Sequence, residues 1–363
     1  MTDVKTVIAP LPPNSTIGII GGGQLGRMLA SSAARLGFRT IVLEPGADCP
    51  AAQTTNRHIV AAYDDEQALA ELARSCDVVT YEFENVPLSA AGYLENLVPL
   101  YPPAQALEMS QDRLLEKQFL QRSGLEVADF HNVELASDLI DALRDFGGGI
   151  LKTRRFGYDG KGQHVFNSAD IDVQSAADIL TQLGGGPYVL ERKIDFVSEF
   201  SVIAARSVAG ETAAYDPSSN IHETGILRSS TVPANLTDEV ADRAGVMAAT
   251  LLNALNYIGV IGVEFFQTEN GLLINEFAPR VHNSGHWTRE ACTTSQFEQH
   301  MRAVTGHALG SVQRHHDCEM INLLGDEGLQ IEHYLKQPAA QVTLYGKSEA
   351  RKGRKMGHIT KLL

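Results

Sequence analysis

The sequence lacks several features that would each point to a particular class of protein. Basic residues are in the minority: 30 Lys and Arg against 44 Asp and Glu give a formal net charge of −14, which repels a nucleic-acid backbone. The four cysteines, Cys49, Cys76, Cys292 and Cys318, show neither a disulfide framework nor zinc-ligand spacing. No apolar run approaches the roughly 18 residues of a membrane helix, and the start lacks a signal peptide. We therefore expect a cytoplasmic protein that binds neither nucleic acid nor membrane.

The length and composition are those of a folded, enzyme-sized chain. At roughly 150 residues per domain, 363 residues predict two or three domains, and 44% hydrophobic residues exclude the disordered class. Breaks in the pattern predict a flexible lead-in, an N-terminal α/β domain, a linker helix with a small central lobe, a larger C-lobe and a C-terminal β unit. Their boundaries are 1–15, 16–110, 111–190, 191–310 and 311–363.

Strand and helix patterns alternate over the first hundred residues. A buried strand at 17–20 leads through glycines into a helix over 24–36, followed by a strand at 40–43. This alternation predicts a Rossmann-like parallel sheet flanked by helices. The later pattern predicts helices over 66–74, 110–123 and 238–253 and strands over 77–81, 188–190, 199–205, 261–267 and 272–277.

A glycine-rich loop follows the first strand. Residues 21–26 fit G-x-G-x-x-G, and Glu44 ends the next strand. This spacing is the dinucleotide fingerprint, in which a phosphate lies at a helix N-terminus and the acid holds a ribose. A plain tight turn and a site for another ligand are the alternatives. No residue placed for hydride transfer accompanies the loop, so we favour another ligand.

A second glycine-rich segment follows Lys152. This lysine ends an apolar strand, and residues 153–163 form a basic loop with three glycines. A lysine beside such a loop suits a polyphosphate, because point charges and backbone N–H groups can cover it. The spacing is not that of a Walker A motif, and a solvated β-hairpin is the alternative.

Two glutamates flank a predicted hairpin turn. A three-residue loop at 269–271 would place Glu264 directly opposite Glu276, whereas an Asn-Gly turn would offset them by one. Directly opposite like charges lie about 5 Å apart and repel. A divalent cation removes this conflict, and oxygen ligands favour Mg²⁺. One exposed and one paired glutamate is the alternative.

Two further polar segments could bind an anionic substrate. Residues 279–288 carry Arg, His, Asn and Ser donors directly after Glu276, although they could also form a capped helix start. Near the C-terminus, positive charge is concentrated at Lys347, Arg351, Lys352, Arg354 and Lys355. A phosphate monoester or a solvated tail would each explain that run.

Read together, four segments are similar to the ATP-grasp superfamily, and most closely to its 5-(carboxyamino)imidazole ribonucleotide synthetase branch. They are IIGGGQLGRM at 19–28, YEFENV at 81–86, RFGYDGKGQ at 155–163 and NEFAPRVHNSGHWT at 275–288. Many ATP-grasp enzymes read Glu-x-Asn after the second strand, whereas Ala278 stands here, as in the imidazole-carboxylating branch. The resemblance implies a three-lobed fold with the central lobe as an ATP lid.

The resemblance also implies an activity. ATP, bicarbonate and aminoimidazole ribonucleotide would give ADP, phosphate and the N5-carboxylated ribonucleotide through carboxyphosphate, in purine biosynthesis. It further implies a homodimer, and a mutase that receives the product. Another ATP-grasp ligase with a different acceptor and a non-catalytic ATP-binding regulator are the alternatives. A dehydrogenase would rest on the glycine loop alone.

The resemblance assigns roles by position. The catalytic group would be Lys152, Asp159, Arg280 and His282, and the Mg²⁺ ligands Glu264 and Glu276. ATP would be bound by Arg113, Lys152, Tyr158, Asp159, Gly160, Lys161, Gly162, Gln163, Glu191, Glu199, His222, Asn275 and Glu276. The ribonucleotide would be bound by Gly22, Gly23, Gln24, Leu25, Glu82, Tyr158, Asp159, Lys161, Arg280, His282, Asn283, Ser284, Lys347 and Arg354.

Overall fold

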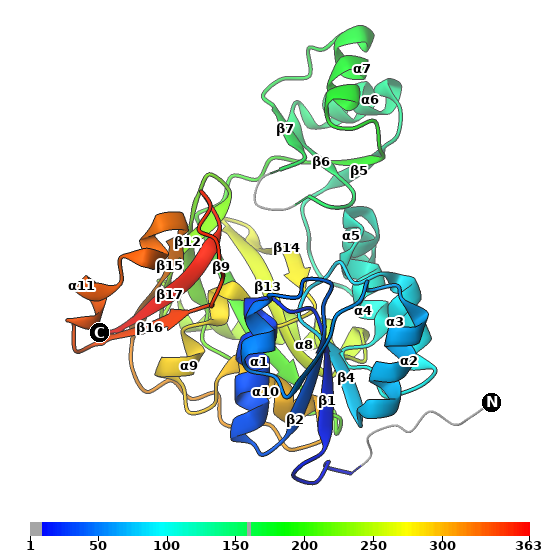
Figure 1. The fold of residues 1–363 in the computed structure, drawn as a ribbon. Coiled ribbons are helices and arrows are strands. Elements are labelled where there is room, and N and C mark those ends of the chain that lie inside the picture. The colour runs from blue at the N-terminus through cyan, green and yellow to red at the C-terminus, as the bar shows by residue number, and fades with distance from the viewer. Residues whose placement is uncertain (1–8, 158–160) are drawn as a thin grey trace.

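The computed structural model describes residues 9–157 and 161–363. Three β-sheets organise it, and a small lobe stands above a larger body (Figure 1). The described part of the predicted lead-in is held against the body, because Leu11 N–H donates to the carbonyl of Thr305 at 2.9 Å. Among the described residues, no helix combines the length and the apolarity that crossing a membrane requires.

The N-terminal sheet is parallel, as its alternating pattern predicts, with strand order β3-β2-β1-β4. Its strands are buried because helices flank the sheet, and this explains their nearly continuous apolar sequence. The elements are β1 (Thr16–Ile20), α1 (Gln24–Arg35), β2 (Arg39–Leu43), the 3-10 turn η1 (Pro50–Gln53), β3 (Arg57–Ile59), α2 (Glu66–Ser75), β4 (Val78–Tyr81), α3 (Leu88–Glu95) and α4 (Ala104–Ser110).

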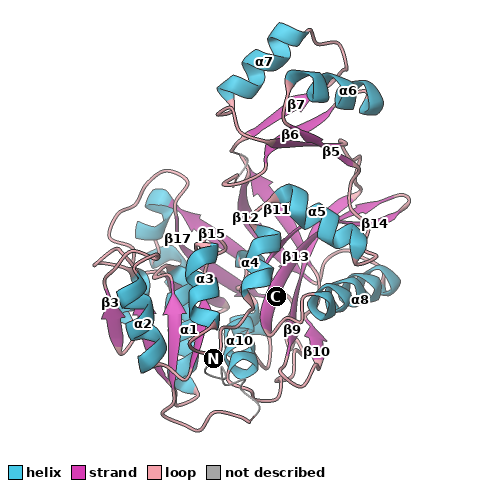
Figure 2. Ribbon diagram, turned by 90° about the vertical axis from the view of Figure 1, so that its right-hand side faces the viewer, coloured by secondary structure: helices cyan, strands magenta, loops and turns pink. Residues whose placement is uncertain are grey.

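The small lobe has its own antiparallel sheet, with order β5-β8-β6-β7, and its own apolar core under two helices (Figure 2). The helix that leads into it begins at Arg113 because the Asp112 side chain caps it, accepting from the N–H groups of Leu114 and Leu115. The elements are α5 (Arg113–Arg122), β5 (Phe130–Val133), α6 (Ala136–Phe146), β6 (Gly149–Thr153), β7 (Gln163–Phe166), α7 (Val173–Gln182) and β8 (Tyr188–Glu191).

The largest sheet runs in the order β14-β13-β9-β11-β12-β15-β17-β16, with β10 paired to β9. The predicted C-terminal β unit forms β15 to β17 and extends this sheet, because β15 pairs with β12. The elements are β9 (Ser198–Arg206), β10 (Thr212–Ala214), β11 (Ser218–Glu223), β12 (Ile226–Val232), α8 (Asp238–Ala254), β13 (Gly259–Thr268), β14 (Gly271–Ala278), η2 (Asn283–Gly285), α9 (Thr288–Ala291), α10 (Gln296–Val304), β15 (Cys318–Leu324), η3 (Gly325–Leu329), α11 (Glu332–Leu335), β16 (Ala340–Leu344) and β17 (Lys355–Leu362).

Candidate active site

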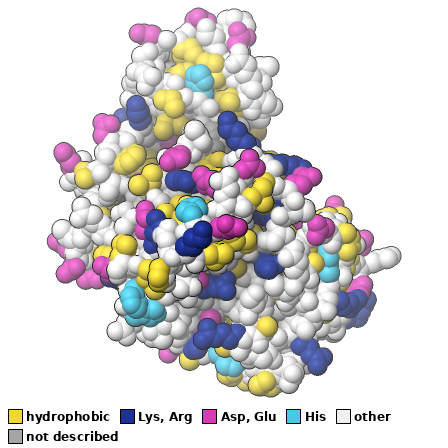
Figure 3. Space-filling model, turned by 60° about the vertical axis from the view of Figure 1, so that its left-hand side comes forward, with side chains coloured by type: hydrophobic (Ala, Val, Ile, Leu, Met, Phe, Trp, Pro, Cys, Tyr) yellow, Lys and Arg dark blue, Asp and Glu magenta, His cyan; other side chains and the backbone are white. Residues whose placement is uncertain are grey.

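A cleft of about 570 Å³ lies where the three sheets meet. Figure 3 shows basic, acidic and histidine side chains gathered between the small lobe and the body. The predicted site residues that line the cleft are Gln24, Leu25, Glu82, Arg113, Lys152, Lys161, Gln163, Glu199, His222, Glu264, Asn275, Glu276, Arg280, His282 and Asn283. Residues that are more than 200 positions apart in the sequence therefore share one cavity.

The hairpin of β13 and β14 places Glu264 opposite Glu276, but neither predicted loop produces this register. Thr268 pairs with Gly271, so the loop is Glu269–Asn270 and would by itself set Glu264 opposite Asn275. A bulge between Glu264 and Phe265 shifts the register by one residue and restores the pair. Because a bulge interrupts the alternation of side chains, the consecutive residues Asn275 and Glu276 both line the cleft.

The paired glutamates differ in their electrostatic surroundings. Burial, together with the like charges of Glu276 and Glu199, raises the pKa of Glu264 to about 8. Burial also acts to raise the pKa of Glu276, but an ion pair with Arg113 Nη1 at 2.8 Å outweighs it and holds that pKa below its ordinary value. One carboxylate thus has a cationic partner, and the other is left to hold a proton or a cation.

Two buried charged residues of α5 hold the bulge, and the sequence analysis missed both. The Phe277 N–H, freed by the bulge, donates to Glu116 Oε1 at 2.8 Å. Lys117 Nζ donates to the carbonyl of Asn275 at 3.4 Å. The sequence predicts a helix here without a role for these two side chains, and their inward direction depends on a strand some 160 residues further along the chain.

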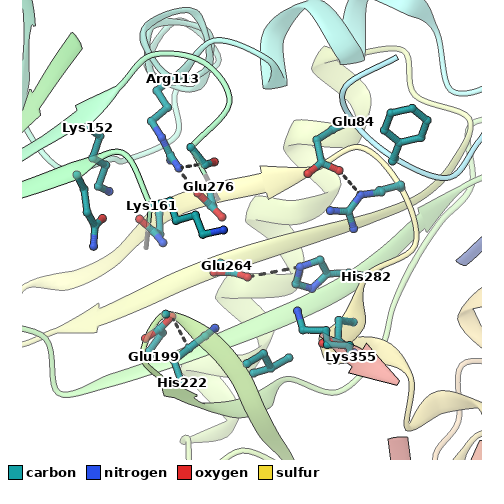
Figure 4. A pocket seen from close by; sticks show the side chains of 18 of the residues that line it. Glu84, Arg113, Lys152, Lys161, Glu199, His222, Glu264, Glu276, His282 and Lys355 are labelled. Atoms are coloured by element: carbon teal, nitrogen blue, oxygen red, sulfur yellow. Dashed lines mark hydrogen bonds and ion pairs between the residues drawn. The ribbon is translucent and has the colours of Figure 1, made fainter. Parts of the chain in front are cut away.

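Lys152 projects into the cleft from β6, beside the predicted ATP residues (Figure 4). It is bound to Glu191 Oε2 at 3.0 Å, and Lys117 contacts the same oxygen at 3.1 Å. Burial acts to raise the pKa of Glu191, but the two lysines lower it to about 2, so this carboxylate is an anion. Glu191 lies behind Lys152 rather than in the cleft lining, and its effect is to fix the lysine in place.

A carboxylate and imidazole group at the base of the cleft fits a divalent cation. Glu199, His222 and Glu264 each offer a ligand atom within 4.8 Å of the others, and no similar group occurs elsewhere in the described residues. Two of these donors are carboxylate oxygens, the ligand type that Mg²⁺ prefers. The predicted pair was Glu264 and Glu276, and Figure 4 shows Glu276 directed toward Arg113.

The other end of the cleft carries the predicted ribonucleotide residues. Arg280 forms an ion pair with Glu84, a residue that the prediction left out although it lies in the quoted YEFENV segment. His282 Nε2 lies 3.5 Å from Glu264 Oε1. Burial and the cations Arg280 and Lys355 lower the pKa of His282 to about 3. The unpredicted lining residues include Lys355, which the basic C-terminal run brings in on β17.

The glycine loop is filled by carboxylates. Glu82 accepts hydrogen bonds from the N–H groups of Gly23 at 2.7 Å and Gly26 at 2.8 Å, and Glu44 accepts from Gly22 at 2.8 Å. A Cβ at Gly23 would lie 2.5 Å from Glu82 Oε1, so a side chain here would displace the Glu82 carboxylate. The loop therefore aims Glu82 at the cleft, which agrees with the preference for a ligand other than a dinucleotide.

The other predicted residues that the structure describes lie outside the cleft lining. Ser284 is fully buried, contrary to a direct substrate contact, because its hydroxyl binds protein groups. Lys347 Nζ donates to the Lys355 carbonyl at 2.7 Å, and Arg354 Nη1 to the Glu349 carbonyl at 2.9 Å. Gly22, Gly23, Gly162 and Glu191 lie behind lining residues, and Tyr158, Asp159 and Gly160 lie outside the described residues.

Comparison with known proteins gives three consecutive family matches. A ribonucleotide synthetase preATP-grasp domain matches residues 14–111, an ATP-grasp domain 118–297, and a phosphoribosylaminoimidazole carboxylase C-terminal domain 318–363. A Brucella melitensis protein named N5-carboxyaminoimidazole ribonucleotide synthase is 55% identical over 97% of each chain.

Solved structures agree with these matches. N5-carboxyaminoimidazole synthetase from Staphylococcus aureus, complexed with ADP, has a TM-score of 0.92 at 36% identity, covering 99% of this chain and 96% of its own. The Aspergillus clavatus enzyme in complex with ADP and 5-aminoimidazole ribonucleotide has a TM-score of 0.89 at 31% identity, covering 96% and 94%.

Proposed function

The chain belongs to the N5-carboxyaminoimidazole ribonucleotide synthases, an ATP-dependent ligase family, and from this premise we propose how its cleft works. The reaction is the carboxylation of the amine of 5-aminoimidazole ribonucleotide by ATP and bicarbonate, with release of ADP and phosphate, in purine biosynthesis. One observation carries the proposal: the cleft joins a cationic phosphate end around Lys152 and Arg113 to a polar end around Glu82, Arg280 and His282.

The phosphate end binds and activates ATP. Lys152 and Arg113 would neutralise the transferring phosphoryl group, and Glu199 and His222, which also line the cleft, would contact the nucleotide. Glu264 and Glu276, with Glu199 nearby, would hold Mg²⁺, which would supply charge neutralisation to the transferring phosphoryl group. An oxygen of bicarbonate attacks the γ-phosphorus, the bond to ADP breaks, and carboxyphosphate forms.

The polar end completes the carboxylation. Carboxyphosphate breaks down to CO₂ and phosphate, and the narrow cleft limits the loss of CO₂ to water. The amine of the ribonucleotide attacks the carbon and gives up a proton, for which Asp159 is the candidate acceptor. Arg280 and His282 orient the anionic groups, Glu82 contributes to the ribonucleotide pocket, and Lys347 and Arg354 hold the 5′-phosphate.

The proposal extends to the chain's partners and location. As family resemblance implies, the protein would form a homodimer, act in the cytoplasm, and pass its product to the N5-carboxyaminoimidazole ribonucleotide mutase. The formal net charge of −14 supports action on small molecules rather than on nucleic acid.

Phosphate release from ATP tests the proposed function. We expect release that requires both bicarbonate and aminoimidazole ribonucleotide, and a loss of about 10³-fold or more in turnover for Glu276→Gln. Glu126→Gln is a matched control, because Glu126 forms an exposed ion pair with Arg243 away from the cleft. Release without the ribonucleotide, or full activity of the Glu276 variant, would contradict the proposal.

A further inference from the structure

His282 lines the cleft, and both its backbone and its Cβ are held by neighbouring residues. Gln296 binds both of its backbone groups, accepting from its N–H at 2.9 Å and donating to its carbonyl at 2.7 Å. Its Cβ packs against β13 at Gly262, where an added Cβ would lie only 2.6 Å away. The ring therefore has little freedom, and only its Nε2 edge faces Glu264 and the cleft.

The other ring nitrogen, Nδ1, is contacted by two polar groups of Ser284. The backbone N–H of Ser284 lies 3.4 Å from Nδ1, and the Ser284 hydroxyl lies 2.8 Å from it. A backbone N–H can only donate, so Nδ1 must present its lone pair. In a neutral imidazole, the single proton is then on Nε2.

A buried chain of hydrogen bonds behind Ser284 also favours donation of the Ser284 hydroxyl proton to His282 Nδ1. Ser201 donates its hydroxyl proton to Ser284 Oγ at 2.6 Å, which leaves the Ser284 proton for His282 Nδ1. Asn220 Nδ2 donates to Ser201 Oγ at 2.9 Å, and Ser230 donates to Asn220 Oδ1 at 2.8 Å. The donors follow one another toward the histidine, and the three serines are at most 1% exposed.

We propose that Ser201 and Ser284 are positioning residues that set the tautomer of His282, so that an Nε2–H donor faces the cleft. A proton on Nε2 prevents this nitrogen from acting as a base or a metal ligand, and makes it a donor to anionic oxygen atoms. The catalytic consequence rests on the proposed function, whereas the tautomer does not.

The tautomer can be measured directly in the full-length protein without substrates. Histidine labelled with ¹⁵N distinguishes a protonated from an unprotonated ring nitrogen in long-range proton–nitrogen spectra, and His282→Gln identifies the signals of this residue. We expect the wild-type signals to show a proton on Nε2 and none on Nδ1. A wild-type proton on Nδ1 would overturn the proposal whatever the assay shows, so its failure is distinct from failure of the proposed function.

Substitutions then test the serines. Ser284→Ala and Ser201→Ala should each produce a mixture of tautomers and lower kcat by about five- to tenfold, with the KM for ATP within about twofold of wild type. Ser201→Thr keeps a hydroxyl and should restore the single tautomer. Ser198→Ala is the matched control, since this partly buried serine lies on the same strand as Ser201 but donates its hydroxyl to Gln267 Oε1 at 2.9 Å, away from His282. An unchanged tautomer in both alanine variants would overturn the proposal, and the wild-type spectrum decides its first part even if a variant does not fold.

Discussion

Individual side chains in the cleft differ in charge state although they carry the same group. Glu264 and Glu276 are both carboxylates at the same level of one hairpin, yet burial and like charges raise the pKa of the first, whereas Arg113 lowers that of the second. The sequence predicts that these two residues lie on facing strands, either directly opposite each other or offset by one residue. The charge difference requires Arg113, which lies 163 positions before Glu276.

The raised pKa of Glu264 predicts proton-coupled cation binding. Below pH 8 the carboxyl is mostly protonated, and a divalent cation must displace that proton. We expect Mg²⁺ affinity to rise about tenfold per pH unit up to pH 8, with close to one proton released at pH 7. Calorimetry in two buffers of different ionisation enthalpy measures that number. Identical heats in the two buffers at pH 7 would contradict the prediction.

Lys347 predicts a pH dependence at the ribonucleotide end. Burial and the neighbouring Arg354 lower the pKa of Lys347 to about 8, so its cation is present below pH 8 and is lost above it. If Lys347 holds the 5′-phosphate, the KM for the ribonucleotide should rise several-fold between pH 7 and pH 9. Lys347→Arg, which stays charged throughout, should remove that rise. A parallel rise in both proteins would assign the effect to another group.

At the scale of elements, the hairpin and the helix α5 form one structural unit. Alternation and turn residues were sufficient to predict β13 and β14 closely, because these signals are local. Local sequence signals could not predict the bulge, because the Asn275 carbonyl and the Phe277 N–H are bound by side chains of a distant helix. The positions of Glu116 and Lys117 could not be predicted for the same reason.

The contact between α5 and the bulge predicts opposite outcomes for two substitutions of Glu116. Burial and Glu276 raise the pKa of Glu116 to about 8, so its neutral acid accepts from Phe277 at pH 7. Glu116→Gln should preserve that acceptor, so its unfolding free energy and Mg²⁺ affinity should stay near those of the wild type. Glu116→Ala leaves a buried N–H unpaired, and should cost about 1–3 kcal/mol of unfolding free energy and weaken Mg²⁺ binding.

Denaturant unfolding and a cation titration measure the two effects. Equal losses of stability and of Mg²⁺ binding in the alanine and glutamine variants would contradict the prediction. They would show that these properties depend on the charge of Glu116 rather than on its hydrogen bond.

At the scale of the whole molecule, the cleft is lined by residues from three sheets, which follow one another along the chain. The parallel sheet, the small lobe and the sheet of β13 and β14 were each predictable from periodicity and glycine positions. Their meeting at one cavity was not, because no local signal places Glu84 beside Arg280 or Lys355 beside His282. The family resemblance predicted a shared site for many of these residues but left out Glu84 and Lys355, and the comparisons show the family to which the chain belongs.

Binding across three sheets predicts stabilisation by nucleotide. A ligand that binds only the folded protein at 100 times its Kd adds about 2.7 kcal/mol, so ADP with Mg²⁺ should raise the melting temperature by several degrees. NADH should give no shift, because the glycine loop already binds Glu82 and Glu44. A thermal-shift assay compares them. Stabilisation by NADH alone would revive the dinucleotide interpretation of the loop.

The bulged residue of β14, Asn275, has a consequence for comparing the sequences of related proteins. Loss of the single codon for Asn275 would leave Glu276 still opposite Glu264, because the hairpin loop would then set the register without a bulge. A sequence alignment would show only a one-position gap between intact acidic motifs. The cleft would nevertheless have lost an amide side chain and the carbonyl that Lys117 binds, so a gap at this column should be treated as a change of active site.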